Sequence, residues 1–314
     1  MDGGYLQLWS GSRNPEEVRG PDIPPSVDFE VVGPDADAAA RAFDRQSGRT
    51  LYDIPRDRAD AFAATFEAAR HGLDASLRAF PTQVPHRERV RRAIAGGEPD
   101  FLISGVPVVA IGGVPADRAL PVLATEGEDE WSWAHFRIVC RDGSAVASRR
   151  LGPIGIDWAR FVFADADALD AWEHERPIDG LADVVFWGRD AERIAAELGV
   201  GPTGTAGEQD TFGWLNLPVE QARGRALALD GSLDRESRWV KVDFRPHSHH
   251  WQVMADVRGS EYDVATIEVG GARMMYAMTS VGDGFFPVTL ELDADGVPVA
   301  VQITVTDDES SEEP

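Results

Sequence analysis

The feature that most constrains the fold of this chain is a recurring unit. A short β-branched or aromatic run is followed by Pro or Asp and then by an Ala-rich helical pattern. Residues 29–32 lead into a predicted helix over 38–43, and residues 50–54 lead into a longer predicted helix. The longer helix carries four apolar residues on one face, at i, i+4, i+7 and i+11: Phe62, Phe66, Ala69 and Leu73. The N-terminal part is therefore predicted to alternate strands with helices.

The unit returns later in the chain, where residues 160–163 and 182–187 are predicted strands, each followed by an Asp-initiated helix. Asp-Ala-Asp-Ala occurs at 35–38 and again at 165–168. Asp57 and Asp190 are separated by a similar length of chain. This spacing hints at an internal duplication.

The C-terminal part is predicted to be mainly strand. Residues 131–140 and 145–150 form a predicted hairpin across Asp142-Gly143, and residues 285–292 and 297–306 form another across Asp293-Ala294-Asp295-Gly296. The predicted fold class is α+β, with N-terminal strand-helix units and a C-terminal, mainly antiparallel sheet region. Three parts are expected: an α+β region over 1–128, an α+β region with the antiparallel sheet over 129–306, and a disordered acidic tail over 307–314.

Charge and cysteine content exclude several classes of protein. The chain has 30 basic and 54 acidic residues and a net charge of -24, which opposes binding to nucleic acid or to anionic membranes. A single cysteine, Cys140, excludes an intramolecular disulfide and fits a reducing cytosol. The N-terminus lacks the features of a signal peptide, and the longest apolar run, over 101–116, is interrupted by Gly and Pro. We expect a soluble bacterial cytoplasmic protein, whose oligomeric state the sequence does not indicate.

A histidine-rich segment, Arg-Pro-His-Ser-His-His-Trp over 245–251, is the first candidate site. If it continues a strand, His247 and His249 share a face and provide two imidazole ligands for a metal. If Ser248 caps a helix over 249–257, the two histidines are separated. A third metal ligand is not evident, so no metal and no cofactor is expected. The flanking side chains are candidate binding residues: Arg245, His250 and Trp251.

The second candidate is Asp283, between two glycines in Gly282-Asp283-Gly284-Phe285-Phe286-Pro287-Val288. An exposed aspartate there could act as a general base or cation ligand, and with His247 and His249 it forms the candidate catalytic set. The favoured interpretation is a turn that closes a hairpin, with the glycines providing conformational freedom.

Two further features are expected to be structural. His86, Arg87, Arg89, Arg91 and Arg92 form the one basic cluster of the sequence. A phosphate or an acidic partner could bind it, but a short helix with Val90 and Ile94 inward and a solvated basic face is the favoured interpretation. Cys140 is predicted to be a buried structural thiol rather than a nucleophile.

From about Gly155 onward, the strand-Asp/Pro-helix units, the Gly-Asp-Gly-x-aromatic-Pro motif over 282–287 and the terminal hairpin resemble a family of bacterial domains of unknown function. The resemblance covers about half of the chain and does not include the histidine-rich segment. It implies a mixed, mostly β domain, and an immunity or interaction role such as that suspected for some relatives near toxin genes.

No convincing catalytic constellation occurs in the sequence, so a non-catalytic protein that binds a basic protein partner is the expected function. A metal-assisted hydrolase that uses His247 and His249 is the alternative. A small-ligand-binding or purely structural domain pair is a third possibility.

Overall fold

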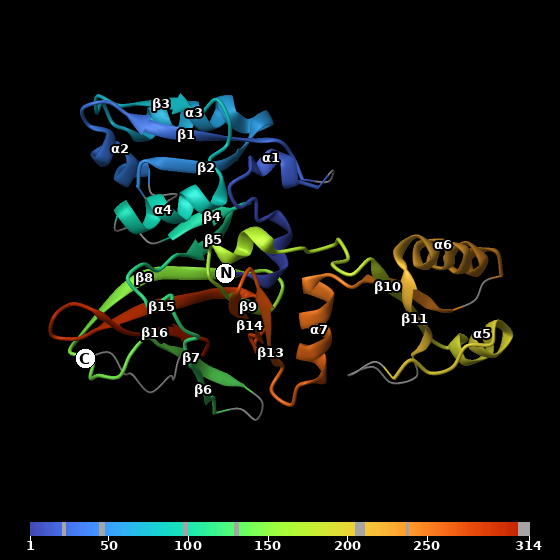
Figure 1. The fold of residues 1–314 in the computed structure, drawn as a ribbon. Coiled ribbons are helices and arrows are strands. Elements are labelled where there is room, and N and C mark those ends of the chain that lie inside the picture. Colours follow the sequence, from blue (N-terminus) through green and yellow to red (C-terminus); the bar gives the residue numbers. More distant parts are fainter. Residues whose placement is uncertain are drawn as a thin grey trace. The chain divides into compact units, whose positions relative to one another are not determined.

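The computed structural model describes residues 1–20, 23–43, 48–96, 100–128, 132–204, 211–236 and 239–306. The fold is α+β, as predicted, with helices packed on antiparallel sheets (Figure 1). The chain forms two compact units: unit 1 comprises Met1–Asp170 and Met278–Pro314, and unit 2 comprises Ala171–Ala277. The expected division at residue 128 differs from this one, because it falls between two adjacent strands of one sheet, β6 (Val122–Glu126) and β7 (Trp133–Val139). The expected acidic tail over 307–314 lies outside the described residues.

The first sheet of unit 1 has the strand order β2-β1-β3, with β1 (Ser26–Val32) in the middle. Its other strands and the two helices that pack on it are β2 (Thr50–Pro55), β3 (Ser76–Ala79), α2 (Ala36–Phe43) and α3 (Ala59–Ala69). Phe66 of α3 is fully buried, and Phe62, Ala69 and Leu73 pack against the same core cluster. The predicted apolar face of this helix is confirmed.

The helix α4 (His86–Gly96) and the hairpin of β4 (Asp100–Ile103) and β5 (Val106–Val109) follow. The buried residues of α4 are His86, Arg89 and Ala93, whereas Ile94 is 43% exposed. The predicted inward face of this helix is therefore wrong. Arg89 replaces the expected apolar residues because two buried carboxylates from other elements face it, as described below.

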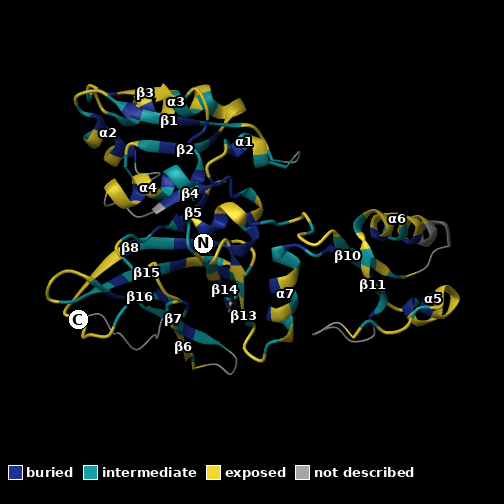
Figure 2. Cartoon of the chain, in the orientation of Figure 1, coloured by how far each residue is buried: buried dark blue, intermediate teal, exposed yellow. Residues whose placement is uncertain are grey.

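A five-stranded sheet completes unit 1, with the order β6-β7-β16-β15-β8. Its C-terminal strands, β15 (Gly284–Leu292) and β16 (Pro298–Thr304), form the predicted hairpin, and Asp293 Oδ1 accepts hydrogen bonds from the amides of Asp295 and Val297 in its turn. Buried residues line these strands and β7 (Figure 2). The hairpin predicted across Asp142-Gly143 is wrong: β7 pairs with β16 and β8 (Ala147–Ile156) pairs with β15. The last hairpin of the chain lies between the two segments that were expected to pair.

Unit 2 contains a second three-stranded antiparallel sheet, with the order β11-β10-β12. Its strands and helices are β10 (Leu181–Trp187), α5 (Ala191–Leu198), β11 (Phe212–Pro218), α6 (Val219–Glu236) and β12 (Lys241–Pro246). The chain continues through α7 (His249–Gly259) into a hairpin of β13 (Val264–Val269) and β14 (Ala272–Met278). The predicted stop of α5 at Gly199 is confirmed, since Gly199 has φ +68°.

The remaining elements are short: η1 (Gly3–Leu8), α1 (Pro15–Val18), η2 (Arg56–Arg58), β9 (Arg160–Phe163) and η3 (Ala168–Ala171). Across the described part of the chain, every helix is too short or too polar to cross a membrane.

Candidate functional site

The histidine-rich segment forms the start of a helix. Ser248 is the N-cap of α7, and its Oγ accepts a hydrogen bond from the amide of Trp251 at 3.3 Å and donates one to the carbonyl of His174 at 2.7 Å. The capped helix is therefore confirmed, and the continuous strand is wrong. His247 lies in the corner between β12 and α7, whereas His249 and His250 are the first residues of the helix.

His247 lies between two carboxylates. Its Nδ1 is 2.8 Å from Oδ2 of Asp179, and its Nε2 is 3.1 Å from Oδ1 of Asp183. Partial burial opposes the charged imidazolium, but the hydrogen bonds to both aspartates outweigh burial and raise the pKa of His247. The pKa of Asp179 is lowered, because hydrogen bonds from His247 and from the amide of Leu181 exceed the opposing effect of burial. Both ring nitrogens of His247 are thus engaged in an ion-pair network.

His249 is held in a different way. Its Nδ1 accepts a hydrogen bond from the amide of Glu173 at 2.9 Å, and its ring stacks on Trp172 at 5.5 Å between centroids. Burial lowers the pKa of His249, which favours the neutral ring. His247 and His249 therefore have separate partners, and within the described residues no group of three or more His, Cys, Asp or Glu side chains could hold a metal ion.

The other candidate residues of this segment also have structural contacts. The ring of His250 stacks on His174 at 4.1 Å between centroids. Arg245 is buried, its Nε donates to Asp243 at 3.0 Å, and its guanidinium lies 5.8 Å from the ring centroid of Trp251. These contacts hold the β12–α7 corner in place. Asp179 and Asp183 were missed in the sequence, although an aspartate within the apolar run of β10 signals a buried polar partner.

Asp283 has a structural role in unit 1. Its Oδ1 accepts a hydrogen bond from the amide of Ala159 at 2.9 Å. The turn itself is closed by Thr279, whose Oγ1 donates to the carbonyl of Gly282 at 2.6 Å. The prediction that this turn closes a hairpin is wrong. The strand that follows the turn, β15, pairs with β8 and β16. Asp283 belongs to unit 1 and the histidines to unit 2, so the candidate catalytic set is divided between the units.

Exposed apolar side chains occur on the two segments that meet at the Gly-Asp-Gly turn. The hydrogen bond from Ala159 to Asp283 joins two segments, and both carry large exposed apolar residues. These are Trp158, 53% exposed, Val281, 47% exposed, and Phe285, 72% exposed. Such residues are uncommon on a surface that contacts water alone when they gather in one region, and they are typical of protein interfaces. Their exposure was not predicted from the sequence.

The basic cluster of the sequence contains Arg89, which is fully buried in an ion-pair network. Arg89 donates from Nη1 to Oδ2 of Asp53 at 2.8 Å, from Nη2 to Oδ1 of Asp53 at 2.8 Å and from Nη2 to Oδ2 of Asp28 at 3.3 Å. Its guanidinium also lies 4.4 Å from the ring centroid of Tyr52. Burial raises the pKa of Asp28, whereas the pKa of Asp53 is lowered because Arg89 more than offsets burial. The predicted solvated face is wrong for Arg89 and correct for Arg91 and Arg92, which are exposed beside Glu88.

Cys140 is fully buried, as predicted, and burial raises the pKa of its thiol. A thiol with a raised pKa stays protonated near neutral pH and is a poor nucleophile.

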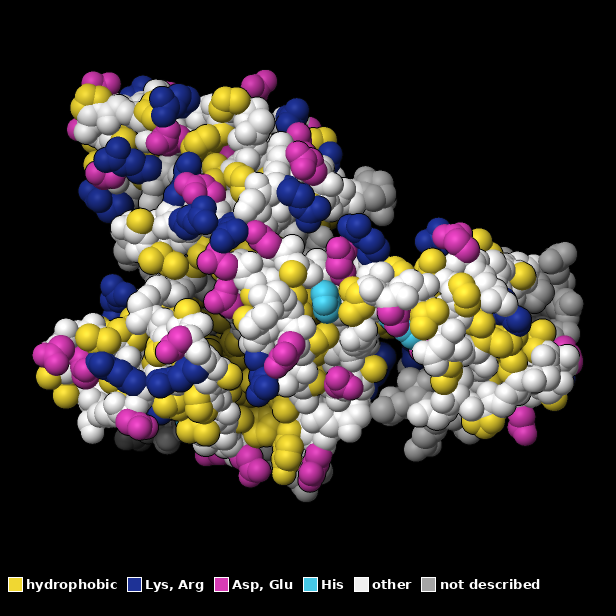
Figure 3. All heavy atoms as spheres, viewed as in Figure 1, with side chains coloured by type: hydrophobic (Ala, Val, Ile, Leu, Met, Phe, Trp, Pro, Cys, Tyr) yellow, Lys and Arg dark blue, Asp and Glu magenta, His cyan; other side chains and the backbone are white. Residues whose placement is uncertain are grey.

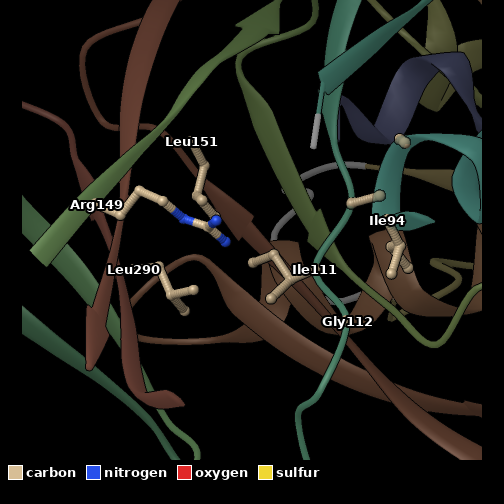
Figure 4. Close-up of a pocket in the computed structure, with 8 residues that line it drawn as sticks. Ile94, Ile111, Gly112, Arg149, Leu151 and Leu290 are labelled. Carbon is tan, nitrogen blue, oxygen red and sulfur yellow. The ribbon is translucent and has the colours of Figure 1, made fainter. Parts of the chain in front are cut away.

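A small cavity of about 100 Å³ lies in unit 1, lined by apolar residues and by Arg149. The guanidinium of Arg149 points toward Ile111, between Leu151 and Leu290 (Figure 4). Pockets that bind metabolites or drug-sized ligands usually measure about 300–1,000 Å³. This cavity is therefore too small for such a ligand, and the third possibility, a small-ligand-binding domain, has no support from it.

Comparisons with protein-family models, with curated proteins and with solved structures find no match to the chain.

Proposed function

We propose that this chain is a non-catalytic cytoplasmic protein that binds another protein. The observation that carries the proposal is the set of exposed apolar side chains on the two segments joined at the Gly-Asp-Gly turn: Trp158, Val281 and Phe285. Exposed aromatic residues dominate the binding energy of many interfaces, because they bury a large apolar area at a small cost in side-chain entropy.

The charge of the chain indicates the kind of partner. With 54 acidic and 30 basic residues, the protein has a net charge of -24. Acidic side chains are distributed over the face of the molecule in Figure 3, among basic ones. A surplus of this size attracts a cationic protein over a distance and accelerates its association. We therefore assign a basic partner, such as the toxin or nuclease domain that an immunity-type protein holds.

The first test is affinity purification of the tagged protein from its source cells. A basic protein is expected at a near-stoichiometric amount, and raising the salt concentration during capture should reduce its recovery. Recovery of the tagged chain alone, or of an acidic partner, would contradict the proposal.

Matched variants locate the surface. Phe285→Ser and Trp158→Ala should each reduce partner recovery, because they remove exposed apolar area from the proposed interface. Trp239→Ala is the control, since Trp239 is 70% exposed but lies on neither of the two segments that meet at the Gly-Asp-Gly turn. Equal loss with all three variants would indicate that these surface aromatics have no specific role.

A metal-assisted hydrolase using His247 and His249 has less support. The two rings have separate hydrogen-bond partners, and Ser248, which lies between them, is the helix cap rather than a free nucleophile. Elemental analysis of protein purified without a metal-affinity tag tests this alternative. Stoichiometric zinc, manganese, iron or nickel would favour the hydrolase over the binding protein.

A further inference from the structure

Apart from the short α1 and η2 of the first part, two parts of the chain have the same order of elements. Each begins with a short 3-10 helix, η1 or η3, and continues through three antiparallel strands alternating with two helices. In both sheets the first strand lies in the middle, as β2-β1-β3 and as β11-β10-β12. In both, another helix and then an antiparallel hairpin follow, α4 with β4–β5 and α7 with β13–β14.

A tryptophan–histidine stack occurs at the same place in both parts. Trp9 stacks on His86 at 5.6 Å, and Nδ1 of His86 accepts from the amide of Ser10 at 3.0 Å. Trp172 stacks on His249 at 5.5 Å, and Nδ1 of His249 accepts from the amide of the next residue, Glu173, at 2.9 Å. Each histidine is the first residue of its helix, α4 or α7.

A glycine at the end of the central strand is matched as well. Gly33 has φ +120°, and a Cβ there would lie 2.5 Å from the carbonyl oxygen of Asp74. Gly188 has φ +129°, and a Cβ there would lie 2.8 Å from the carbonyl oxygen of Trp239. Oδ2 of Asp35 accepts a hydrogen bond from the amide of Asp74 at 2.8 Å. In the same way, Oδ2 of Asp190 accepts one from the amide of Trp239 at 2.9 Å.

The central strands also carry matched aspartates. Oδ1 of Asp28 accepts from the amide of Asp53, which has φ +55°, and Oδ1 of Asp183 accepts from the amide of Asn216, which has φ +54°. Both distances are 2.8 Å, and both aspartates lie at an irregularity in the strand register. The sequence pattern Asp-x-x-x-x-Gly-x-Asp-Ala occurs at 28–36 and at 183–191. Such matching geometry at three separate places, the tryptophan–histidine stack, the glycine with its nearby aspartate and the aspartate of the central strand, is expected of copies of one unit.

The two parts differ at the ion pair. Arg89 in α4 donates to the carbonyl of Val84 as well as to the aspartates, and the matching residue of α7, Gln252, donates to the carbonyl of His247. Asp53 is matched by Asn216. In the second part, Gln252 and Asn216 thus provide neutral amide side chains where the first part has the ion pair of Arg89 and Asp53. Helix α7 therefore places no guanidinium at the position of Arg89, next to Asp183.

The carboxylate of Asp183 nevertheless remains and is accessible. The side chain of Asp183 is 27% exposed and that of Asp179 is 44% exposed, whereas Asp28 is fully buried under Arg89. His247 contacts one oxygen of each, Oδ2 of Asp179 and Oδ1 of Asp183. Among the described residues, no hydrogen bond reaches Oδ2 of Asp183.

We infer that the two parts are copies of one ancestral unit, and that in the second copy Asp179 and Asp183 bind a guanidinium group of a protein partner where the first copy holds its own Arg89. The side chains of Asp179 and Asp183 are both partly exposed beside His247, and a guanidinium can reach two carboxylates with separate N–H groups, whereas an ammonium acts as a single compact charge. The protein source of this arginine rests on the proposed function, but the guanidinium site itself can be tested without a partner.

The experiment is an NMR titration of the full-length chain with N-acetyl-arginine amide at low salt. Saturable shifts are expected for the amides of residues 179–183 and for the His247 ring. N-acetyl-lysine amide should bind at least several-fold more weakly. Asp179→Asn with Asp183→Asn should abolish the shifts while keeping an oxygen acceptor for the local amides. Asp230→Asn, an exposed carboxylate of α6, is the matched control that should leave them unchanged.

A second variant provides the proposed site with an arginine of the chain itself. Asn216→Asp with Gln252→Arg places the Arg89–Asp53 pair in the second copy, and it should remove probe binding while circular dichroism shows a folded chain. Equal binding of the two probes, or shifts that persist in the double asparagine variant, would overturn the site. Arginine-specific binding without any basic partner in cells would leave the site standing and contradict the proposed function. A basic partner that binds the double asparagine variant with unchanged affinity would support the proposed function and contradict the guanidinium site.

Discussion

Among single residues, Arg89 has the clearest energetic role. Its guanidinium and Asp28 are fully buried and Asp53 is largely buried, so removal of Arg89 leaves these carboxylates without a countercharge. We expect Arg89→Met to lower the free energy of unfolding of unit 1 by about 3–5 kcal/mol in urea titrations. Arg91→Met, on the exposed side of the same helix, should change the stability by less than about 0.5 kcal/mol. Similar effects of the two substitutions would show that the network does not form.

His247 makes stability depend on pH. Its pKa is raised in the folded state, so its contribution is complete below the ordinary histidine pKa of about 6.5 and is lost as pH rises through the raised value. We expect unit 2 to become less stable to urea as the pH rises above about 6.5, and we expect His247→Gln to flatten that dependence. An unchanged slope in the variant would show that His247 does not contribute through protonation.

His86 has the opposite dependence. Burial lowers its pKa to about 3, and the neutral ring accepts from the amide of Ser10. The unfolded chain binds a proton below about pH 6.5 that the folded chain does not bind, so stability falls with acidification between those two pKa values. The residues responsible for both pH effects are visible in the sequence, but their partners are not. Asp179, Asp183 and Ser10 are brought to the rings only by the fold.

At the scale of single elements, the cap of α7 is directly testable. Ser248→Ala removes an acceptor for the amide of Trp251 and should destabilise unit 2 by about 1 kcal/mol, measured by urea denaturation. Ser248→Thr retains the hydroxyl and should restore most of the loss. If alanine and threonine behave alike, the hydroxyl is not the stabilising group.

The two matched glycines test the internal copies. Gly33→Ala and Gly188→Ala each place a Cβ against a backbone carbonyl at positive φ, and each should cost more than about 1 kcal/mol. Gly224→Ala is the control, because it lies in α6 with open space around it and should stabilise by up to about 1 kcal/mol. Tolerance of alanine at only one of the two matched positions would indicate that their backbones are not equivalent.

Most helices and strands were predictable because their signals are local. The apolar spacing of α3, the glycine stop of α5 and the Asp-x-Asp-Gly turn between β15 and β16 each depend on a few neighbouring residues. Strand pairing was not predictable to the same extent. Residues 131–140 and 145–150 read as a hairpin, yet the last two strands of the chain separate them. The burial of Arg89 was missed for the same reason, since Asp28 and Asp53 are remote in sequence.

The internal duplication also shows the limit of sequence spacing. The repeated Asp-Ala-Asp-Ala motif aligned Asp35 with Asp165, whereas the structure matches Asp35 with Asp190. Because Asp and Ala are abundant in this chain, a short motif of those residues carries little information. Hydrogen bonds to matched amides define the correspondence better.

For the whole molecule, the central claim is that an acidic protein binds a basic partner through an exposed apolar surface. The most direct measurement is the association rate of the purified partner with the full-length chain, recorded by surface-immobilised binding over a series of salt concentrations. We predict that the association rate falls steeply with salt while the dissociation rate changes little, and that Phe285→Ser raises mainly the dissociation rate. An association rate independent of salt, together with a dissociation rate unaffected by Phe285→Ser, would contradict the claim.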